Sequence, residues 1–153
     1  MSLRLLPSLD SLDSNQKLEL VGFQRDPALL NRVKFLSDQD RALVELSLRH
    51  GLSRRKMGLA LGLTAGTVTR RLRRLMNRLR DPLIVAITDP LCTLPAEHRQ
   101  ITIEYFLHDF PIPKIAQIHQ MTRFEVREML EYVRGWHRGV SKESRTRNHE
   151  VMS

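Results

Sequence analysis

The chain repeats one pattern of residue types after 58 positions, and no gap is needed to align the two copies. The first copy reads SRRKMGLALGLTAGTVTRRL over residues 53–72, and the second reads PIPKIAQIHQMTRFEVREML over residues 111–130. The match continues upstream, where Leu36 aligns with Leu94. A gap-free repeat of this length predicts two similar supersecondary units in tandem.

Each repeat has the residue pattern of two short helices joined by a tight turn. In the first repeat, Ser53 is a candidate N-cap of a helix that ends at Leu61, and Gly62 can adopt the left-handed conformation that ends a helix. Thr64 is the candidate N-cap of the next helix, and Gly58 is the small residue where the two helices cross closely. The apolar residues of that next helix form one stripe at intervals of 4, 3 and 4, namely Val68, Leu72, Leu75 and Leu79. The pattern predicts a helix-turn-helix.

The stretch GLSRRKMGLALGLTAGTVTRRLRRLMNRL resembles the DNA-binding region 4 of sigma-70-type transcription initiation factors. In that family a Gly-Leu-Ser, a Lys-containing short helix, an Ala-x-x-Leu-Gly-Leu turn and a Gly-Thr-Val-x-x-Arg-Leu recognition helix follow in this order. The stretch LPAEHRQITIEYFLHDFPIPKIAQIHQMTRFEVREML resembles the same region more loosely. The two matches cover about residues 37–80 and 94–136. The resemblance implies binding of double-stranded DNA in a transcriptional setting.

One part of a complete sigma factor has no counterpart here. Sigma factors also carry a region that binds the polymerase clamp and melts the promoter with exposed aromatic side chains. The 36 residues before the first repeat are too few for such a region. We therefore expect a sigma-like protein without the promoter-melting region.

The expected fold is all-α, with two tandem helix-turn-helix units joined by a short apolar linker. A helix over about residues 38–50 covers the first helix pair, and the polar composition of the chain end predicts disorder there. The predicted divisions are an N-terminal segment 1–36 with a helix over about 27–36, a first unit 37–81, a linker 82–93, a second unit 94–139 and a disordered tail 140–153.

The net charge of +8 is concentrated on the first repeat. Residues 38–81 contain eleven Lys/Arg and four Asp/Glu, which gives +7, whereas residues 94–139 contain six of each, which gives zero. Binding to a phosphate backbone needs positive charge. The first repeat is therefore the predicted DNA-binding unit.

With the apolar stripe of residues 65–79 turned inward, the opposite face of that helix is basic. Arginine binds both guanine edges and phosphates, and the first two turns of a recognition helix usually reach the bases, which favours Thr67, Arg70 and Arg74. The first turn of the preceding helix commonly meets phosphate. The alternative is a basic face that contacts only solvent. The predicted DNA-binding residues are Ser53, Arg54, Arg55, Lys56, Thr64, Gly66, Thr67, Arg70, Arg71, Arg73, Arg74, Asn77 and Arg78.

The second repeat has a different outer face. With Val126, Leu130 and Val133 inward, this face carries three carboxylates, which would repel a phosphate backbone, and two aromatic rings, which suit a protein partner. Three roles stay open: a scaffold that packs on the first repeat, a protein contact or homodimer interface, and, least favoured by charge, a DNA contact. The predicted partner surface consists of Phe124, Glu128, Glu131 and Tyr132, next to Glu125.

The linker DPLIVAITDPLCTLP is compatible with a helix or with a strand. Asp81 and Pro82 could start a short helix, whereas Ile84, Val85 and Ile87 favour a strand. A strand here would suit a two-stranded wing, as in LysR-type regulators, whose arginine-rich helix leads into a similar Asp-Pro-Leu passage. The sigma-like repeat that follows favours the helix.

No residue pattern indicates an enzyme. The six histidines have no metal-ligand spacing with one another or with Cys92, and no GxSxG or phosphate-binding loop is present. The single cysteine excludes an internal disulfide. We expect no catalytic residue, metal or cofactor. No apolar run is long enough for a membrane span or a signal peptide, so the cytoplasm is the expected compartment and no membrane is an expected partner.

Two functions remain as hypotheses. In the first, the chain is a transcriptional regulator whose first repeat binds promoter DNA through the major groove, while the second repeat mediates dimerisation or contact with RNA polymerase. In the second, the chain is a sigma-like interaction module that binds RNA polymerase or a sigma factor without touching DNA. The arginine-rich helix favours the first, and the missing promoter-melting region leaves the second open.

Overall fold

The computed structural model describes residues 27–49 and 52–151, and every regular element in these ranges is helical. The expected all-α fold is confirmed for this part of the chain. The chain divides into two compact units, residues 1–80 (unit 1) and residues 81–153 (unit 2). Of the predicted N-terminal segment, residues 1–26 lie outside the described residues. Each unit is considered by itself.

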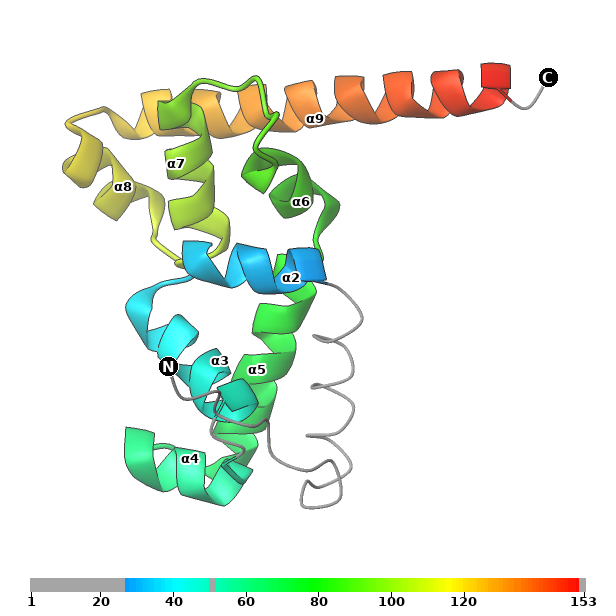
Figure 1. Ribbon diagram of the computed structural model, residues 1–153. Helices are drawn as coiled ribbons and strands as arrows, with labels where there is room; N and C mark the ends of the chain where they lie inside the picture. Colours follow the sequence, from blue (N-terminus) through cyan, green and yellow to red (C-terminus); the bar gives the residue numbers. More distant parts are fainter. Residues whose placement is uncertain (1–26, 50–51, 152–153) are drawn as a thin grey trace, which may run out of the picture. The chain divides into compact units, whose positions relative to one another are not determined.

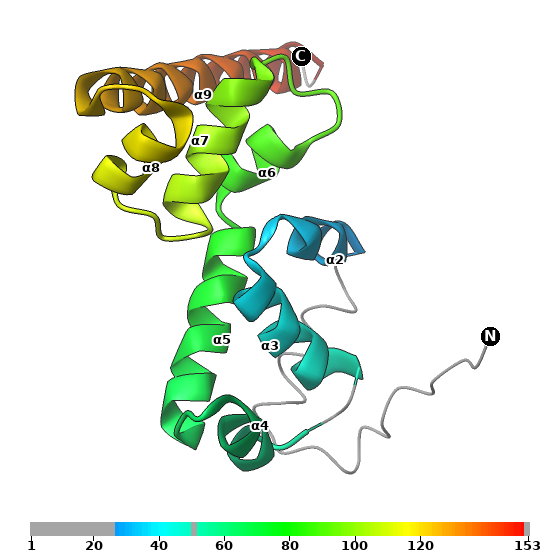
Figure 2. The ribbon, with the colours of Figure 1, turned by 90° about the vertical axis from the view of Figure 1, so that its left-hand side faces the viewer.

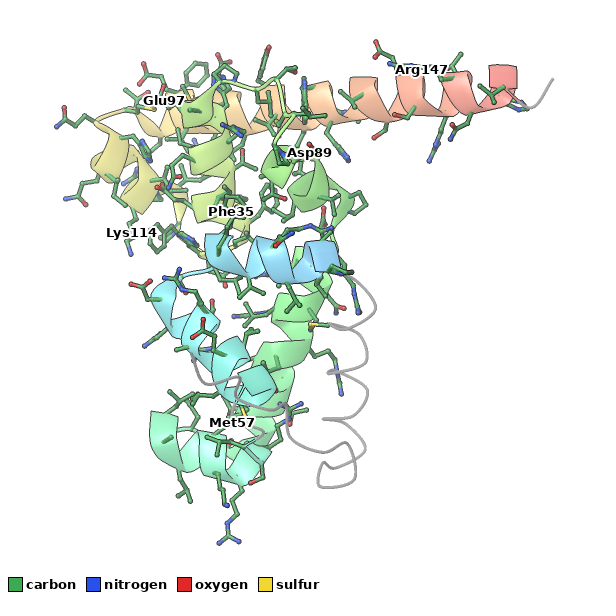
Figure 3. The ribbon with its side chains drawn as sticks, in the orientation of Figure 1. Phe35, Met57, Asp89, Glu97, Lys114 and Arg147 are labelled. Carbon is green, nitrogen blue, oxygen red and sulfur yellow. The ribbon has the colours of Figure 1, made fainter. Side chains whose placement is uncertain are left out.

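Unit 1 contains four α-helices among its described residues (Figure 1): α2 (Pro27–Arg32), α3 (Asp38–Arg49), α4 (Arg54–Leu61) and α5 (Ala65–Leu79). A 3₁₀ turn, η2 (Val33–Phe35), continues α2. α3 packs against both α4 and α5. Leu29, Leu43 and Met57 are fully buried, and Figure 3 shows the position of Met57 on α4. The Nη1 atom of Arg32 donates a 2.6 Å hydrogen bond to the carbonyl of Leu79, which ties α2 to the end of α5.

The turn between α4 and α5 has the predicted caps. The Ser53 side chain accepts a hydrogen bond from the backbone N–H of Lys56, and the Thr64 side chain accepts one from that of Thr67. These bonds satisfy N–H groups that a helix start leaves without an intrahelical partner. Gly62 ends α4 with a φ of 68°, in the left-handed region. Local chemistry thus fixes both the end of α4 and the start of α5.

Gly58 explains how closely α4 approaches this turn. A Cβ atom added at Gly58 would lie 2.3 Å from the carbonyl oxygen of Leu63. The Leu63 N–H also donates to the Gly58 carbonyl at 2.7 Å, so the backbones are in direct contact. A residue with a Cβ atom would clash there, and the sequence predicted a small residue at this position.

Unit 2 contains α6 (Pro82–Thr88), α7 (Ala96–Phe106), α8 (Ile112–His119) and α9 (Arg123–Val151) within the described residues. α6, α7 and α8 all pack against α9 (Figure 2). The core includes Ile101, Ile115, Val126 and Leu130. Side chains of Tyr105, Phe106, Phe110, Ile112, Met121 and Met129 pack around this core and are partly buried.

The passage after α5 is helical, which decides between the two readings of the linker. Asp81 caps α6, because its carboxylate accepts a 2.8 Å hydrogen bond from the N–H of Leu83, and Pro82 occupies the first helical position. Ile84 and Ile87 are buried one turn apart. The β-branched residues therefore serve a helix face here, and no strand forms in this passage.

The helix bounds follow the 58-residue register of the repeat. Shifted by 58, the bounds of α4 become those of α8, and the first residues of α3 and α5 become those of α7 and α9. Gln120 replaces Gly62 and also has a positive φ, of 55°. Thr122 and Glu125 form a capping box, since the Glu125 N–H donates to Thr122 Oγ1 and the Thr122 N–H donates to a Glu125 carboxylate oxygen. The turn geometry persists although the turn sequence has changed.

The predicted disordered tail is wrong for residues 140–151, because α9 continues to Val151. Its last turns extend past the other helices of unit 2 (Figure 1), and Arg147 lies on this part (Figure 3). Polarity alone does not end a helix, and this part contains neither glycine nor proline. Extension also needs no new nucleation step, because α9 is already packed upstream. An ion pair between Arg147 and Glu143, with N···O 3.8 Å, adds local support.

Candidate nucleic-acid interface

The buried side of α5 determines which side chains face outward. Val68, Leu72, Leu75 and Leu79 are each at most 1% exposed, and Met76 joins them. These residues form the predicted stripe, which packs against α3 and α4. The predicted inward face of α5 is therefore confirmed, and the opposite face is open to solvent.

The outward face of α5 carries three arginines at helical spacing. Arg70, Arg73 and Arg74 are exposed, together with Gly66 and Asn77. Thr67 is half-buried, and its hydroxyl lies 2.8 Å from that of Thr64. Arg70 Nη2 lies 3.4 Å from Thr67 Oγ1, so this guanidinium lies over the first turn of α5. Donors capable of reading base edges thus lie where a recognition helix would present them.

Two further arginines of α5 lie at the flanks of this face. Arg71 is half-buried, and its Nε atom lies 4.0 Å from Asp40 Oδ1 on α3. Arg78 is also half-buried. Part of the charge on Arg71 is therefore used inside unit 1, so Arg71 is a weaker candidate for contact with a phosphate than the exposed Arg73.

The first turn of α4 contains three basic residues, of which two are exposed. Ser53, Arg55 and Lys56 are exposed. Arg54 is the exception, because it is only 6% exposed and its Nη1 donates to Ser47 Oγ at 3.3 Å. The prediction that Arg54 faces DNA is therefore wrong. The reason is helical spacing: residues 54, 57 and 58 share one face of α4, and this face is buried.

The two helices together contain basic residues and no acidic ones. α4 contributes three Lys/Arg and α5 contributes five, and neither contains an Asp or Glu. The predicted residues are distributed along α4 and α5, with Arg54 buried and Arg71 engaged with Asp40. An anionic polymer with regularly spaced phosphates matches such a surface.

The matching face of unit 2 has the opposite chemistry. At a shift of 58, Arg70 and Arg73 become Glu128 and Glu131, and Arg74 becomes Tyr132. Val126, Leu130 and Val133 are buried as predicted. Phe124 is 65% exposed and Tyr132 is 58% exposed, so the predicted partner surface is indeed solvent-facing. Over the first three turns, α5 and α9 therefore share their buried apolar positions and differ at the exposed ones.

Two residues beside the exposed face of α9 were not among the predicted site residues. His98, on the first turn of α7, contacts the Tyr132 ring edge-on with centroids 5.2 Å apart. Met129 is partly buried beside it. The register of the repeat could have pointed to both, because they align with Asp40 and Arg71, which meet in unit 1.

Other kinds of site find little support in the described ranges. Within residues 27–49 and 52–151, no group of three or more His, Cys, Asp and Glu side chains could hold a metal ion. The helices of the same ranges include none that is both long and apolar enough to cross a membrane.

Comparison with known proteins adds no relative. No protein-family model matches the chain, and neither does a curated protein or a solved structure.

Proposed function

We propose that the chain is a DNA-binding transcriptional regulator similar to region 4 of sigma factors. In this proposal α4 and α5 act as a helix-turn-helix, with α5 in the major groove of duplex DNA. The observation that carries it is the charge of these two helices, which have eight Lys/Arg and no Asp/Glu. The exposed Arg70, Arg73 and Arg74 supply donors for base edges and phosphates.

The same proposal assigns distinct roles to the exposed residues of unit 1. Thr67, Arg70 and Arg74, on the first turns of α5, read bases. Ser53, Arg55 and Lys56, at the start of α4, contact phosphates and set the orientation of the helix on the duplex. Arg54 has a structural role, because its side chain is buried against α3.

Unit 2 acts in this proposal as a scaffold or as a protein contact. Its exposed face carries Glu125, Glu128 and Glu131, which would repel phosphates. RNA polymerase and a second copy of the chain are the candidate partners. The exposed Phe124 and Tyr132 favour a second candidate function, in which the chain binds RNA polymerase or a sigma factor and no DNA at all.

A titration of the full chain tests the main proposal. Fluorescence anisotropy would follow binding to random duplex DNA and to duplexes enriched from a random pool, each at two salt concentrations. We expect binding that weakens with salt and favours the enriched sequences. A folded chain that binds no duplex at the lower salt concentration would leave the protein-interaction module as the better account.

Substitutions separate the roles of base and phosphate contacts. Replacing Arg70 and Arg74 with Ala should weaken binding to the enriched sequences by about 1–3 kcal/mol for each bidentate base contact that is lost. Replacing Arg55 with Ala should weaken binding to the enriched and the random duplexes by the same factor, because phosphates carry no sequence information. If the Arg70 and Arg74 variant stays folded and keeps full preference for the enriched sequences, the assignment of base readers is wrong.

A further inference from the structure

A shallow groove lies in unit 2 between the first turn of α7 and the first half of α9. It has a volume of about 320 Å³ and is lined by His98, Glu125, Glu128, Met129 and Tyr132. The four residues on α9 are spaced at i, i+3, i+4 and i+7, so they share one face of the helix. Two carboxylates, two rings and a thioether therefore surround one small space.

The groove is negatively charged. Within the described part of the chain, Glu128 makes no hydrogen bond or ion pair, and no lysine or arginine lines the groove. Thr122 donates to Glu125 through its backbone N–H at 2.7 Å and its hydroxyl at 3.0 Å, and both bonds end on Oε2. These bonds hold the pKa of Glu125 below its ordinary value, which keeps the carboxylate charged. Oε1 of Glu125 remains open to another donor.

The rings of the groove can accept a cation. Tyr132 is 58% exposed, and His98 meets it edge-on. The Nδ1 atom of His98 has no hydrogen-bond partner among the described residues, so that atom does not fix the ring. A cation over the exposed face of a tyrosine ring is stabilised by the charge distribution of the ring. Met129 adds an apolar surface for the carbon atoms of a long side chain.

The first repeat shows what can occupy the same place. His98 aligns with Asp40, and Met129 aligns with Arg71. In unit 1 the Nε atom of Arg71 lies 4.0 Å from Asp40 Oδ1, so that unit has an arginine of its own between the two helices. In unit 2 the arginine is missing, and carboxylates stand at the positions of Thr67 and Arg70 instead. Met129 thus takes the position of that arginine, and no lysine or arginine lines the groove beside the two carboxylates.

We propose that this groove receives an arginine side chain from a protein partner. The guanidinium would bridge Glu125 and Glu128, stack on Tyr132 and lay its carbon chain against Met129. Arginine fits better than lysine, because a planar guanidinium can both bind two carboxylates and stack on a ring. The inference does not depend on whether unit 1 binds DNA.

The test uses the full chain and two matched peptides. One is the blocked tripeptide acetyl-Gly-Arg-Gly-amide. The other has citrulline in place of arginine, and the side chain of citrulline is neutral and has nearly the same shape. Nuclear magnetic resonance would follow the backbone amides of Glu125, Glu128, Met129 and Tyr132 during titration. We expect saturable shifts with the arginine peptide and binding at least about tenfold weaker with citrulline, because charge-assisted bidentate bonds are lost.

Variants of the lining residues test whether the arginine peptide binds in the groove. Glu128→Gln and Tyr132→Leu should each weaken binding of the arginine peptide by about fivefold or more, since each removes one kind of contact. Glu143→Gln is the control, because Glu143 is exposed on the same helix but outside the groove, and it should change nothing. The ¹H–¹⁵N spectra of the variants also establish that each one is folded.

Three results would overturn the proposal. The first is equal binding of the citrulline peptide, and the second is a folded Glu128→Gln variant with unchanged affinity. The third is a set of shifts at the same amides that appears when the chain is concentrated without peptide, which would assign the groove to a second copy of the chain.

Discussion

Gly58 and Gly66 lie eight residues apart on either side of one turn and should respond to alanine in opposite ways. Gly58→Ala would place a Cβ 2.3 Å from the Leu63 carbonyl oxygen, which is backbone and cannot rotate away. We expect a loss of about 1–3 kcal/mol in the stability of unit 1. Gly66→Ala meets no atom within 4 Å and should be neutral or stabilising by about 0.5–1 kcal/mol. Hydrogen exchange of the α5 amides measures both, and equal effects would contradict this packing.

Gln120 holds a conformation that glycine adopts more easily. Its φ of 55° lies in the left-handed region, where a residue with a Cβ pays roughly 1 kcal/mol. Gln120→Gly should therefore stabilise unit 2 by about 1 kcal/mol, whereas Gln117→Gly, inside α8, should destabilise it by about the same amount. The only tryptophan, Trp136, lies in unit 2, so its fluorescence during denaturant unfolding reports on both variants. Destabilisation by Gln120→Gly would argue against the left-handed turn.

Glu125 should make the stability of unit 2 depend on pH. Hydrogen bonds from the Thr122 backbone and side chain lower the pKa of this carboxylate in the folded state. A lowered folded-state pKa means that the stabilisation is fully present above the unfolded-state pKa. It is lost as pH falls through the folded-state pKa. Glu125→Gln keeps a capping-box acceptor but cannot titrate. Between about pH 5 and pH 3, the wild-type chain should lose more stability than this variant, as measured by Trp136 fluorescence; parallel losses would contradict the capping assignment.

At the scale of the element, the repeat made most of the fold predictable. Ser53, Gly62 and Thr64 identified both ends of the α4–α5 turn, and the stripe from Val68 to Leu79 identified the buried face. Each of these signals is local, because capping and helical periodicity act within one or two turns. The helical character of α6 depended on context, since β-branched residues suit a buried helix face as well as a strand.

The failures at this scale have a common physical cause. Arg54 was assigned to the surface by its charge, yet it shares a buried face with Met57. The tail after Val140 was assigned to disorder by its polarity, yet it extends a helix that is already packed. In both cases the packing of neighbouring residues decided the structure, and the polarity of the residues themselves did not. The groove beside Tyr132 was missed for a related reason, because His98 and Met129 become neighbours only when α7 packs on α9.

At the scale of the whole molecule, the central feature is a division of charge between two copies of one pattern. Buried apolar residues recur at matching positions such as Val68 and Val126, whereas Arg70 and Arg73 in one copy are Glu128 and Glu131 in the other. Packing constrains the buried positions of both copies equally. Packing does not constrain the exposed positions in this way, and in the proposed function the two surfaces have different roles.

The salt dependence of DNA binding tests this division most directly. Two matched variants of the full chain would be compared over a series of salt concentrations: Arg73→Gln with Arg74→Gln, and Arg123→Gln with Arg127→Gln. Each removes two exposed arginines, from the middle of α5 or from the first two turns of α9. The first should flatten the plot of log affinity against log salt by about 1–2 units, because each phosphate contact contributes roughly 0.9. The second should leave the slope unchanged. Equal flattening by both variants would mean that α9 also lies on DNA, and the proposed separation of roles would be wrong.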